Sequence, residues 1–383
     1  MKNWQASAFA IICQYMKNTN NKTVTSEVRA EQVTNRAYEV IYLGVDLHKA
    51  TISVTRIIDG STPQAAQRLS WESFWRFVEK QLSLAKKVPV VYEAGAFGFG
   101  PCRKLKALGA DCYVIHPEKL DPRRKRVQTD KLDAQHLADK LQRYVLGNRK
   151  AMVPVYVPTE QEEQQRLQAR HRRSLLKQMQ SLMARGRGLL LGQGIFQTQN
   201  WWKASVWEVL KGKLPVSLQA ILEDQRVLIE QCRALLKPVE KQLEASAPKE
   251  LPRGFGRLTF ALMLRELCNY QRFKNRRNVG GFTGLCGAVS SSGPYHLDLS
   301  INKAGSPYLR TLLIELAWRV IYWQPNYTGR NVWKRFCEDG GTMHKRRRKM
   351  AVVALARQLA VDIWKWQTGK VTPEQLGWIM TSA

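Results

Sequence analysis

The most constraining feature of this 383-residue sequence is an alternation of short apolar runs and helical patterns between residues 40 and 117. Val40–Val45 and Ala50–Ile58 are rich in β-branched residues and are predicted to pair as a hairpin. The patterns that follow predict, in chain order, a helix over 71–84, a strand over 89–92, a helix over 102–108 and a strand over 112–115. Such alternation predicts an α/β domain with one mixed sheet.

Four carboxylates fall at the ends of these elements. Asp46 and Glu93 each follow a predicted strand, and Asp130 and Asp133 lie at the start of a predicted helix. Residues three apart share one face of a helix, so all four can meet at one edge of the sheet. Clustered carboxylates repel one another unless a cation is present, and their hard oxygen atoms suit Mg²⁺ or Mn²⁺. Two such ions can hold the attacking and leaving oxygens of a phosphodiester.

Each of these residues has a simpler explanation when it is taken alone. An Asp after a strand is commonly a turn residue, Asp130 is a suitable helix cap, and Asp133 suits the first turn of a helix. The order of the four in a strongly basic chain favours the metal-binding interpretation.

The sequence around these carboxylates resembles a known family. The matching segments are Tyr42–Ala50, Val91–Ala94, Val114–Pro117 and Thr129–Ala134. They are similar to the DEDD motif of the insertion-sequence one-ten transposases, including the eleven-eleven branch. The resemblance implies a RuvC-like domain of RNase H-like fold. It also implies that Asp46, Glu93, Asp130 and Asp133 are catalytic and bind two Mg²⁺ ions.

The second half of the chain resembles the other domain of the same family. The segments are Phe273–Asn275, Phe282–Leu285, Ser291–Gly293, Ile301–Gly305 and Leu309–Arg310. The resemblance implies that Ser292 is the nucleophile, and the run of three serines leaves Ser291 as an alternative. A serine hydroxyl that attacks a DNA phosphate would conserve bond energy for rejoining. Apart from the resemblance, serine and glycine here indicate only a polar turn. Gly280, Gly281, Gly284 and Gly287 predict a glycine-rich loop just before it.

A helical region separates the two halves. Thr159 and Glu162 form a plausible capping box for a long helix, and a second long helix is expected to bury Leu228, Cys232, Leu235, Val239 and Leu243. The fold class expected is therefore an α/β RNase H-like (RuvC-like) domain, a long helical coiled-coil arm and a mostly α C-terminal domain. The predicted parts are an extension over 1–38, the DEDD domain over 39–150, the arm over 151–250 and the serine domain over 251–383.

The charge balance points to a polyanionic partner. Sixty-one Lys and Arg face 31 Asp and Glu, which gives a formal net charge of +30. Neither a basic amphipathic helix nor a lipidation signal favours a membrane surface, so nucleic acid is the expected partner. The candidate contacts lie in four basic groups: Arg123, Arg124, Lys125 and Arg126; Arg276 and Arg277; Lys303 and Arg310; and Lys345, Arg346, Arg347 and Arg348.

Cysteine spacing and hydropathy indicate the cellular compartment of the protein. The seven cysteines are scattered, and no two have C-x-x-C spacing, so a zinc site is not expected. This pattern suits free thiols in a reducing cytoplasm. No apolar run approaches the roughly 20 residues of a membrane span. The expected location is the bacterial cytoplasm, in association with the nucleoid.

The leading interpretation is a recombinase that excises and inserts a mobile element through serine-linked strand exchange. The resemblance implies donor and target DNA, a guide (bridge) RNA encoded by the element, and a homo-oligomer, either a dimer or a tetramer. Two alternatives stay open. One is a metal-dependent junction endonuclease that uses water, and the other is a non-catalytic nucleic-acid-binding protein.

Overall fold

The computed structural model describes residues 36–117, 130–292, 295–336 and 345–381. They form two compact units that meet between Val157 and Pro158. The expected N-terminal extension lies almost wholly outside the described residues, as do Arg123, Arg124, Lys125 and Arg126. The division into four parts stays a prediction.

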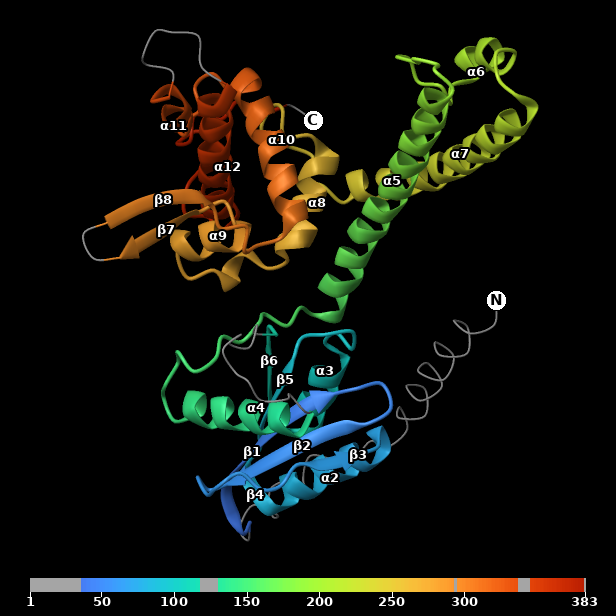
Figure 1. Ribbon diagram of the computed structural model, residues 1–383. Coiled ribbons are helices and arrows are strands. Elements are labelled where there is room, and N and C mark those ends of the chain that lie inside the picture. Colours follow the sequence, from blue (N-terminus) through green and yellow to red (C-terminus); the bar gives the residue numbers. More distant parts are fainter. Residues whose placement is uncertain (1–35, 118–129, 293–294, 337–344, 382–383) are drawn as a thin grey trace. The chain divides into compact units, whose positions relative to one another are not determined.

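The first unit is a mixed α/β fold built on one sheet (Figure 1). Its elements are β1 (Tyr38–Leu47), β2 (Ile52–Ile58), β3 (Gln67–Leu69), α2 (Trp71–Leu84), β4 (Ala85–Lys87), β5 (Pro89–Glu93), α3 (Gly100–Leu108), β6 (Asp111–Ile115) and α4 (Asp130–Val145). The strand order is β3-β2-β1-β5-β6, and β4 also pairs with β1. β1, β2 and β3 are antiparallel, whereas β5 and β6 run parallel to β1.

The predicted α/β alternation is confirmed in this unit. The helix expected over 71–84 is α2, which Ser70 caps by accepting a hydrogen bond from the Ser73 amide at 3.2 Å. The expected hairpin is the antiparallel β1–β2 pair. The short strands β3 and β4 were not predicted, because three residues are too few to show a period-two pattern.

Alternating side chains of the sheet belong to two separate cores. Ile41, Leu43 and Val45 pack in one cluster with residues of α2 and α3. Tyr42 and Val91 belong to a second cluster that includes Leu137, Ala138 and Leu141 of α4. Because successive residues of a strand face opposite sides, α4 covers one face of the sheet, and α2 and α3 cover the other.

The second unit begins with two long helices. Its elements are α5 (Glu160–Gly192), α6 (Ala204–Lys211), α7 (Val216–Ala245), α8 (Arg257–Leu267), η2 (Tyr270–Arg272), α9 (Arg276–Thr283), β7 (Gly287–Ser292), β8 (Tyr295–Ile301), α10 (Pro307–Trp323), α11 (Arg330–Lys334) and α12 (Lys345–Gln367). The predicted capping box is confirmed: Thr159 Oγ1 accepts from the Glu162 amide at 3.2 Å, and Glu162 Oε2 accepts from the Thr159 amide at 2.8 Å.

The long helices α5 and α7 pack as an antiparallel pair. Arg172 in the first half of α5 donates to Glu240 near the end of α7, at 2.8 Å. At the other end, Leu190 of α5 shares a buried cluster with Leu222 of α7. Trp201, Trp202 and Trp207 fill that end, and Trp201 donates its indole N–H to the Met183 carbonyl at 2.9 Å.

The prediction of the buried face of α7 is wrong in part. Leu228 is 46% exposed and Leu235 is 56% exposed, whereas Leu243 is buried and Cys232 and Val239 are half-buried. The buried stripe comprises Leu222, Ile229, Leu236 and Leu243, so Ile229 and Leu236 take the buried positions expected for Leu228 and Leu235. Contact with α5 selects these residues.

The rest of the second unit is mostly helical and is built around one apolar core. That core joins α8, α10 and α12 and includes Ala169 of α5 and Leu243 of α7. The predicted glycine-rich loop is wrong, because Gly280 and Gly281 lie inside α9. The Asn275 side chain caps the start of α9, and Gly284, in the left-handed region at φ +66°, ends it. A β7–β8 hairpin follows, which the polar turn residues did not predict.

Within the described ranges of both units, no helix combines the length and apolar character needed to cross a membrane.

Candidate functional site

Asp46 and Glu93 occupy equivalent positions on neighbouring parallel strands. The register pairs Gly44 with Val91 and Val45 with Tyr92, so Asp46 and Glu93 come next on their strands. Neighbouring strands lie about 4.8 Å apart, and residues in register on parallel strands share a face. Val91 packs against α4, and Glu93 lies two residues further on, so both carboxylates belong to the face that α4 covers.

The N-terminal end of α4 lies at the same edge of the sheet. A Cβ added to Gly44 would lie 2.1 Å from the Ala134 carbonyl oxygen and 2.3 Å from the Ala138 nitrogen. The far end of α4 is marked by Gln142, whose Nε2 would lie 3.6 Å from a Cβ on Gly60. The Asp59 amide donates to the Val40 carbonyl near the start of β1, so Gly60 lies beside that end of the strand. The start of α4 thus lies near the end of β1 and its far end near the start of β1, and the two elements run in opposite directions.

This direction brings the acidic start of α4 toward the end of β1 that carries Asp46. Asp133 is half-buried and lies one residue before Ala134, which touches Gly44. Asp130 is the first residue of α4, and its side chain lies outside the described part of the chain. The backbone thus places Asp46, Glu93 and the first turn of α4 along one sheet edge, as the strand-end pattern predicted.

A histidine contacts the first of these carboxylates. His48 Nε2 lies 2.9 Å from Asp46 Oδ2, with the side chains 49% and 24% exposed. This contact was not predicted, although His48 lies in the segment that carries the family resemblance. Among the side chains that the structure describes, no three His, Cys, Asp or Glu residues gather closely enough to form a metal site.

Ser292 lies at the turn end of the β7–β8 hairpin. Its backbone pairs with Tyr295, and its side chain is outside the description. Ser291 pairs with His296 and is exposed. The exposed apolar side chains Val289, Leu297 and Leu299 follow both strands. The predicted nucleophile, Ser292 or Ser291, therefore lies on a β-hairpin and not in a polar loop. The described side chains of this hairpin are largely exposed.

A tight crossing of the chain supports the base of this hairpin. A Cβ on Gly305 would lie 1.8 Å from the Phe282 carbonyl oxygen, and one on Gly284 would lie 2.6 Å from the Gly305 nitrogen. The Arg310 guanidinium donates to the carbonyls of Lys303 at 3.1 Å and Gly305 at 2.8 Å on one segment, and to the Thr283 carbonyl at 3.4 Å on the other. Arg310 thus holds the two crossing segments together, a role that its predicted nucleic-acid contact did not include.

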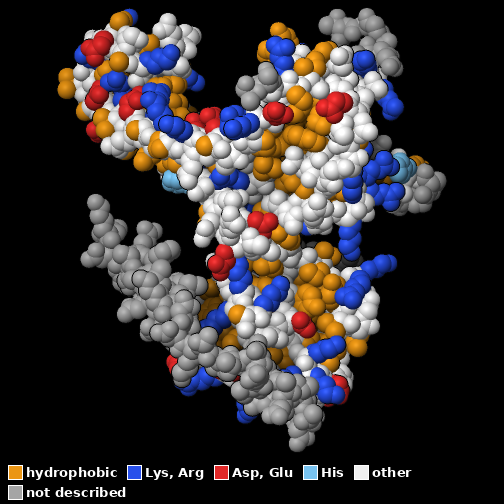
Figure 2. All heavy atoms as spheres, turned by 180° about the vertical axis from the view of Figure 1, so that it is seen from behind, with side chains coloured by type: hydrophobic (Ala, Val, Ile, Leu, Met, Phe, Trp, Pro, Cys, Tyr) orange, Lys and Arg blue, Asp and Glu red, His pale blue; other side chains and the backbone are white. Residues whose placement is uncertain are grey.

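The other predicted basic residues that the structure describes lie on the surface. Arg276 and Arg277 are exposed in the first turn of α9, and Lys303 is exposed in a left-handed turn at φ +57°. Lys345, Arg346, Arg347 and Arg348 are exposed at the start of α12. Arg348 lies over the Trp318 ring at 4.9 Å, and that tryptophan is 37% exposed. On the face drawn in Figure 2, Lys and Arg side chains are spread over both units.

Comparison with known proteins defines the class. Residues 250–333 match the family described as Transposase IS116/IS110/IS902. The chain is 31% identical to "Putative transposase y4rJ" of Sinorhizobium fredii, over 74% of this chain and 78% of that protein. It is 25% identical to the transposase for insertion sequence element IS1533 of Leptospira borgpetersenii, over 73% and 85%. It is 26% identical to the transposase for IS1111A of Coxiella burnetii, over 70% and 75%.

The fold and these similarities together define a transposase of a bacterial insertion sequence. This chain belongs to the IS116/IS110/IS902 transposase family, which confirms the resemblance to the one-ten and eleven-eleven transposases.

Proposed function

We propose that this transposase cuts and rejoins DNA at the ends of its element through a serine-linked intermediate, with Asp46, Glu93, Asp130 and Asp133 as a divalent-metal site. The observation that carries the proposal is the register of β1 and β5. It aligns Asp46 with Glu93 on the face over which α4 begins.

The topology of the first unit supports an RNase H-like, RuvC-like assignment. A three-stranded antiparallel meander leads into two parallel strands, in the order β3-β2-β1-β5-β6. This order puts β1 at the centre, next to β5. The carboxyl ends of two adjacent parallel strands then meet at one edge, where open α/β sheets bind their ligands.

The donor chemistry of this edge fits a divalent cation. Asp46, Glu93 and Asp133 offer carboxylate oxygens, the ligands that Mg²⁺ or Mn²⁺ prefers. When bound, such ions would stabilise negative charge that develops on phosphate and serine oxygens. His48 would orient the Asp46 carboxylate through their 2.9 Å contact, and the close packing of α4 on Gly44 would hold Asp133 in place.

On this proposal Ser292 attacks a DNA phosphate. Its hydroxyl oxygen forms a bond to phosphorus, and the bond to the deoxyribose oxygen breaks. That oxygen leaves with a proton as a free hydroxyl, and the strand stays joined to the protein as a phosphoserine ester. A second hydroxyl then reverses the exchange, so no cofactor energy is needed. The exposed hairpin supports this role, because a nucleophile for a duplex substrate must lie on an accessible surface.

We also propose the partners of the reaction. A net charge of +30 suits several polyanions at once, namely donor DNA, target DNA and a guide RNA encoded by the element.

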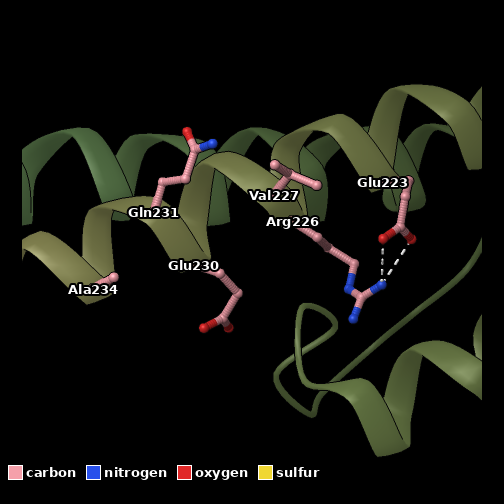
Figure 3. A pocket seen from close by; sticks show the side chains of 6 residues that line it. All are labelled: Glu223, Arg226, Val227, Glu230, Gln231 and Ala234. Carbon is pink, nitrogen blue, oxygen red and sulfur yellow. Dashed lines mark hydrogen bonds and ion pairs between the residues drawn. The ribbon is translucent and has the colours of Figure 1, made fainter.

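The exposed stripe of Ile221, Leu228 and Leu235 supports a homo-oligomer, because such heptad spacing fits a partner helix. Figure 3 shows a neighbouring part of α7, where Val227 and Ala234 line a shallow pocket beside the Arg226–Glu223 ion pair.

A covalent-adduct assay tests the chemistry. Purified protein is mixed with the RNA that flanks its element, a junction-spanning labelled DNA and Mg²⁺, and is then analysed on a denaturing gel. We expect a protein–DNA adduct with the native chain. The adduct should be lost in Ser292→Ala and Asp46→Ala, and when the divalent metal is chelated.

Ser290→Ala is the matched control, since it removes the same hydroxyl from the same strand and should leave the adduct intact. Loss of the adduct in Ser291→Ala alone would move the nucleophile by one residue. Cleaved DNA without an adduct, at the same rate in Ser292→Ala, would reject the serine intermediate in favour of a nuclease that uses water.

A further inference from the structure

A basic pocket lies in the second unit, between the segment before α8 and the end of α10. Its volume is about 600 Å³, and four cationic side chains line it: Lys249, Arg253, Arg257 and Arg319. The described residues around it include Trp323 and no Asp or Glu. Ligand pockets in proteins have volumes of about 300–1,000 Å³, so this one is large enough for a small ligand or one monomer of a chain.

Two glycines shape the pocket wall. Gly254 and Gly256 have φ values of +86° and +71°, in the region that glycine adopts readily. A Cβ on Gly254 would lie 2.8 Å from the Trp323 ring, and one on Gly256 would lie 2.9 Å from Arg319 Nη1. The backbone therefore approaches the Trp323 ring closely at Gly254 and the tip of the Arg319 side chain at Gly256.

The aromatic and cationic groups of the pocket are also held in place. Arg253 lies over the Trp323 ring at 4.6 Å, and Trp323 is 37% exposed. Arg319 donates to the Phe255 carbonyl at 3.2 Å and to Thr259 Oγ1 at 2.8 Å. Burial lowers the pKa of the Arg319 guanidinium from its usual value. A flat guanidinium on an indole ring is a surface on which an unstacked base can lie.

The charge of this pocket is not neutralised within the described part of the chain. Lys249, Arg253 and Arg257 form no ion pair there with an Asp or Glu. All three side chains are exposed, so the pocket presents these unpaired cations on an accessible surface, where a bound anion would meet them.

We propose that this pocket binds one unpaired nucleotide of a single-stranded nucleic acid. Lys249 and Arg257 would contact its phosphate, and the Arg253–Trp323 stack would receive its base. A duplex fits less well, because its bases stay stacked inside the helix and present no face to the guanidinium. The proposal depends on the chain being a nucleic-acid-binding transposase, but it does not depend on Ser292 or on the carboxylate site.

Binding of short homopolymers to the full chain tests this proposal. Fluorescence anisotropy is measured with labelled oligo-dT, oligo-rU and a duplex of equal length, all at one salt concentration. We expect the double variant Lys249→Gln/Arg257→Gln and the single variant Trp323→Leu to weaken single-strand binding at least tenfold. Duplex binding should change by less than about threefold, because only one or two of its many phosphate contacts are lost.

Lys237→Gln/Lys241→Gln is the matched control, because it removes the same charge from two exposed lysines of α7. It should affect single strands and duplex alike, and only weakly. If the pocket variants lose more affinity for oligo-dT than for oligo-rU, the pocket binds an unpaired DNA strand. If they lose more affinity for oligo-rU, it binds RNA. The proposal is overturned if the pocket variants behave like the control, or if they weaken the duplex and the single strand equally.

The test is independent of catalysis. Failure of the serine mechanism would appear in the adduct assay with Ser292→Ala, whereas this experiment needs no cleavage. Thermal melting of Trp323→Leu checks that this variant folds. If it does not fold, the double variant Lys249→Gln/Arg257→Gln still tests the proposal, because both of its residues are exposed.

Discussion

At the scale of single residues, Gly44 shows how the backbone constrains the carboxylate site. It lies two residues before Asp46 on the same face of β1, where α4 crosses closest. A side chain there would push away the helix that carries Asp130 and Asp133. The sequence predicted that Asp46 and Glu93 follow strands, and their role as metal ligands stays a prediction. It did not predict the need for this glycine, because the reason is a contact with a helix about 90 residues away.

Gly44→Ala should therefore destabilise the first unit and reduce adduct formation together. The new Cβ would meet two backbone atoms of α4 at 2.1 and 2.3 Å, and neither atom can rotate away. Overpacking of this kind costs about 1–3 kcal/mol in the free energy of unfolding. Urea denaturation measures it, with Gly100→Ala as control, because a Cβ at Gly100 has nothing within 4 Å. Equal midpoints for the two variants would contradict the close approach of α4.

At the scale of elements, the sequence predicted helices and strands well where one apolar pattern was unambiguous. The spacing over 71–84 gave α2 with its observed ends. Two elements were misread for physical reasons. The glycines of α9 favour a loop by propensity, but the Asn275 cap and the packing of Gly280 near Cys286 stabilise a helix. On α7, two apolar stripes differ by one residue, and only the tertiary partner decides which is buried.

The antiparallel pair of α5 and α7 offers a prediction from two glycines on one helix. Gly186 is buried against Trp201, and a Cβ there would lie 2.0 Å from the indole Cζ2. Gly188 has nothing within 4 Å of an added Cβ. Gly186→Ala should lower the melting temperature, because it displaces the ring that closes one end of this pair. Gly188→Ala should raise the free energy of unfolding by up to about 1 kcal/mol, since alanine favours helix.

Differential scanning calorimetry of both variants checks the sign of each effect. The same chemical change is made two positions apart on α5, so helix propensity acts equally on both variants. If both substitutions stabilise the chain, Trp201 does not pack against Gly186 as described. If both destabilise it, the exposed face of α5 has a partner outside the described residues.

At the scale of the whole molecule, the excess of positive charge predicts binding but does not locate it. The basic pocket is one example, since Arg253 and Trp323 lie 70 positions apart in the sequence and meet only in the fold. The basic run of α12 is another. Lys345 and Arg346 are exposed where the described part of α12 begins, and the exposed Arg347 and Arg348 follow them. Consecutive exposed cations are a suitable place for phosphate contacts.

Replacing these two cations should weaken binding and reduce its salt dependence. Lys345→Gln/Arg346→Gln removes two positive charges and should bind DNA more weakly. The slope of log K against log salt should become shallower by about 2, because each lost phosphate contact removes roughly 0.9 from it. Lys345→Arg/Arg346→Lys keeps both charges and should leave the slope unchanged. An unaltered slope in the neutral variant would mean that neither Lys345 nor Arg346 contacts a phosphate.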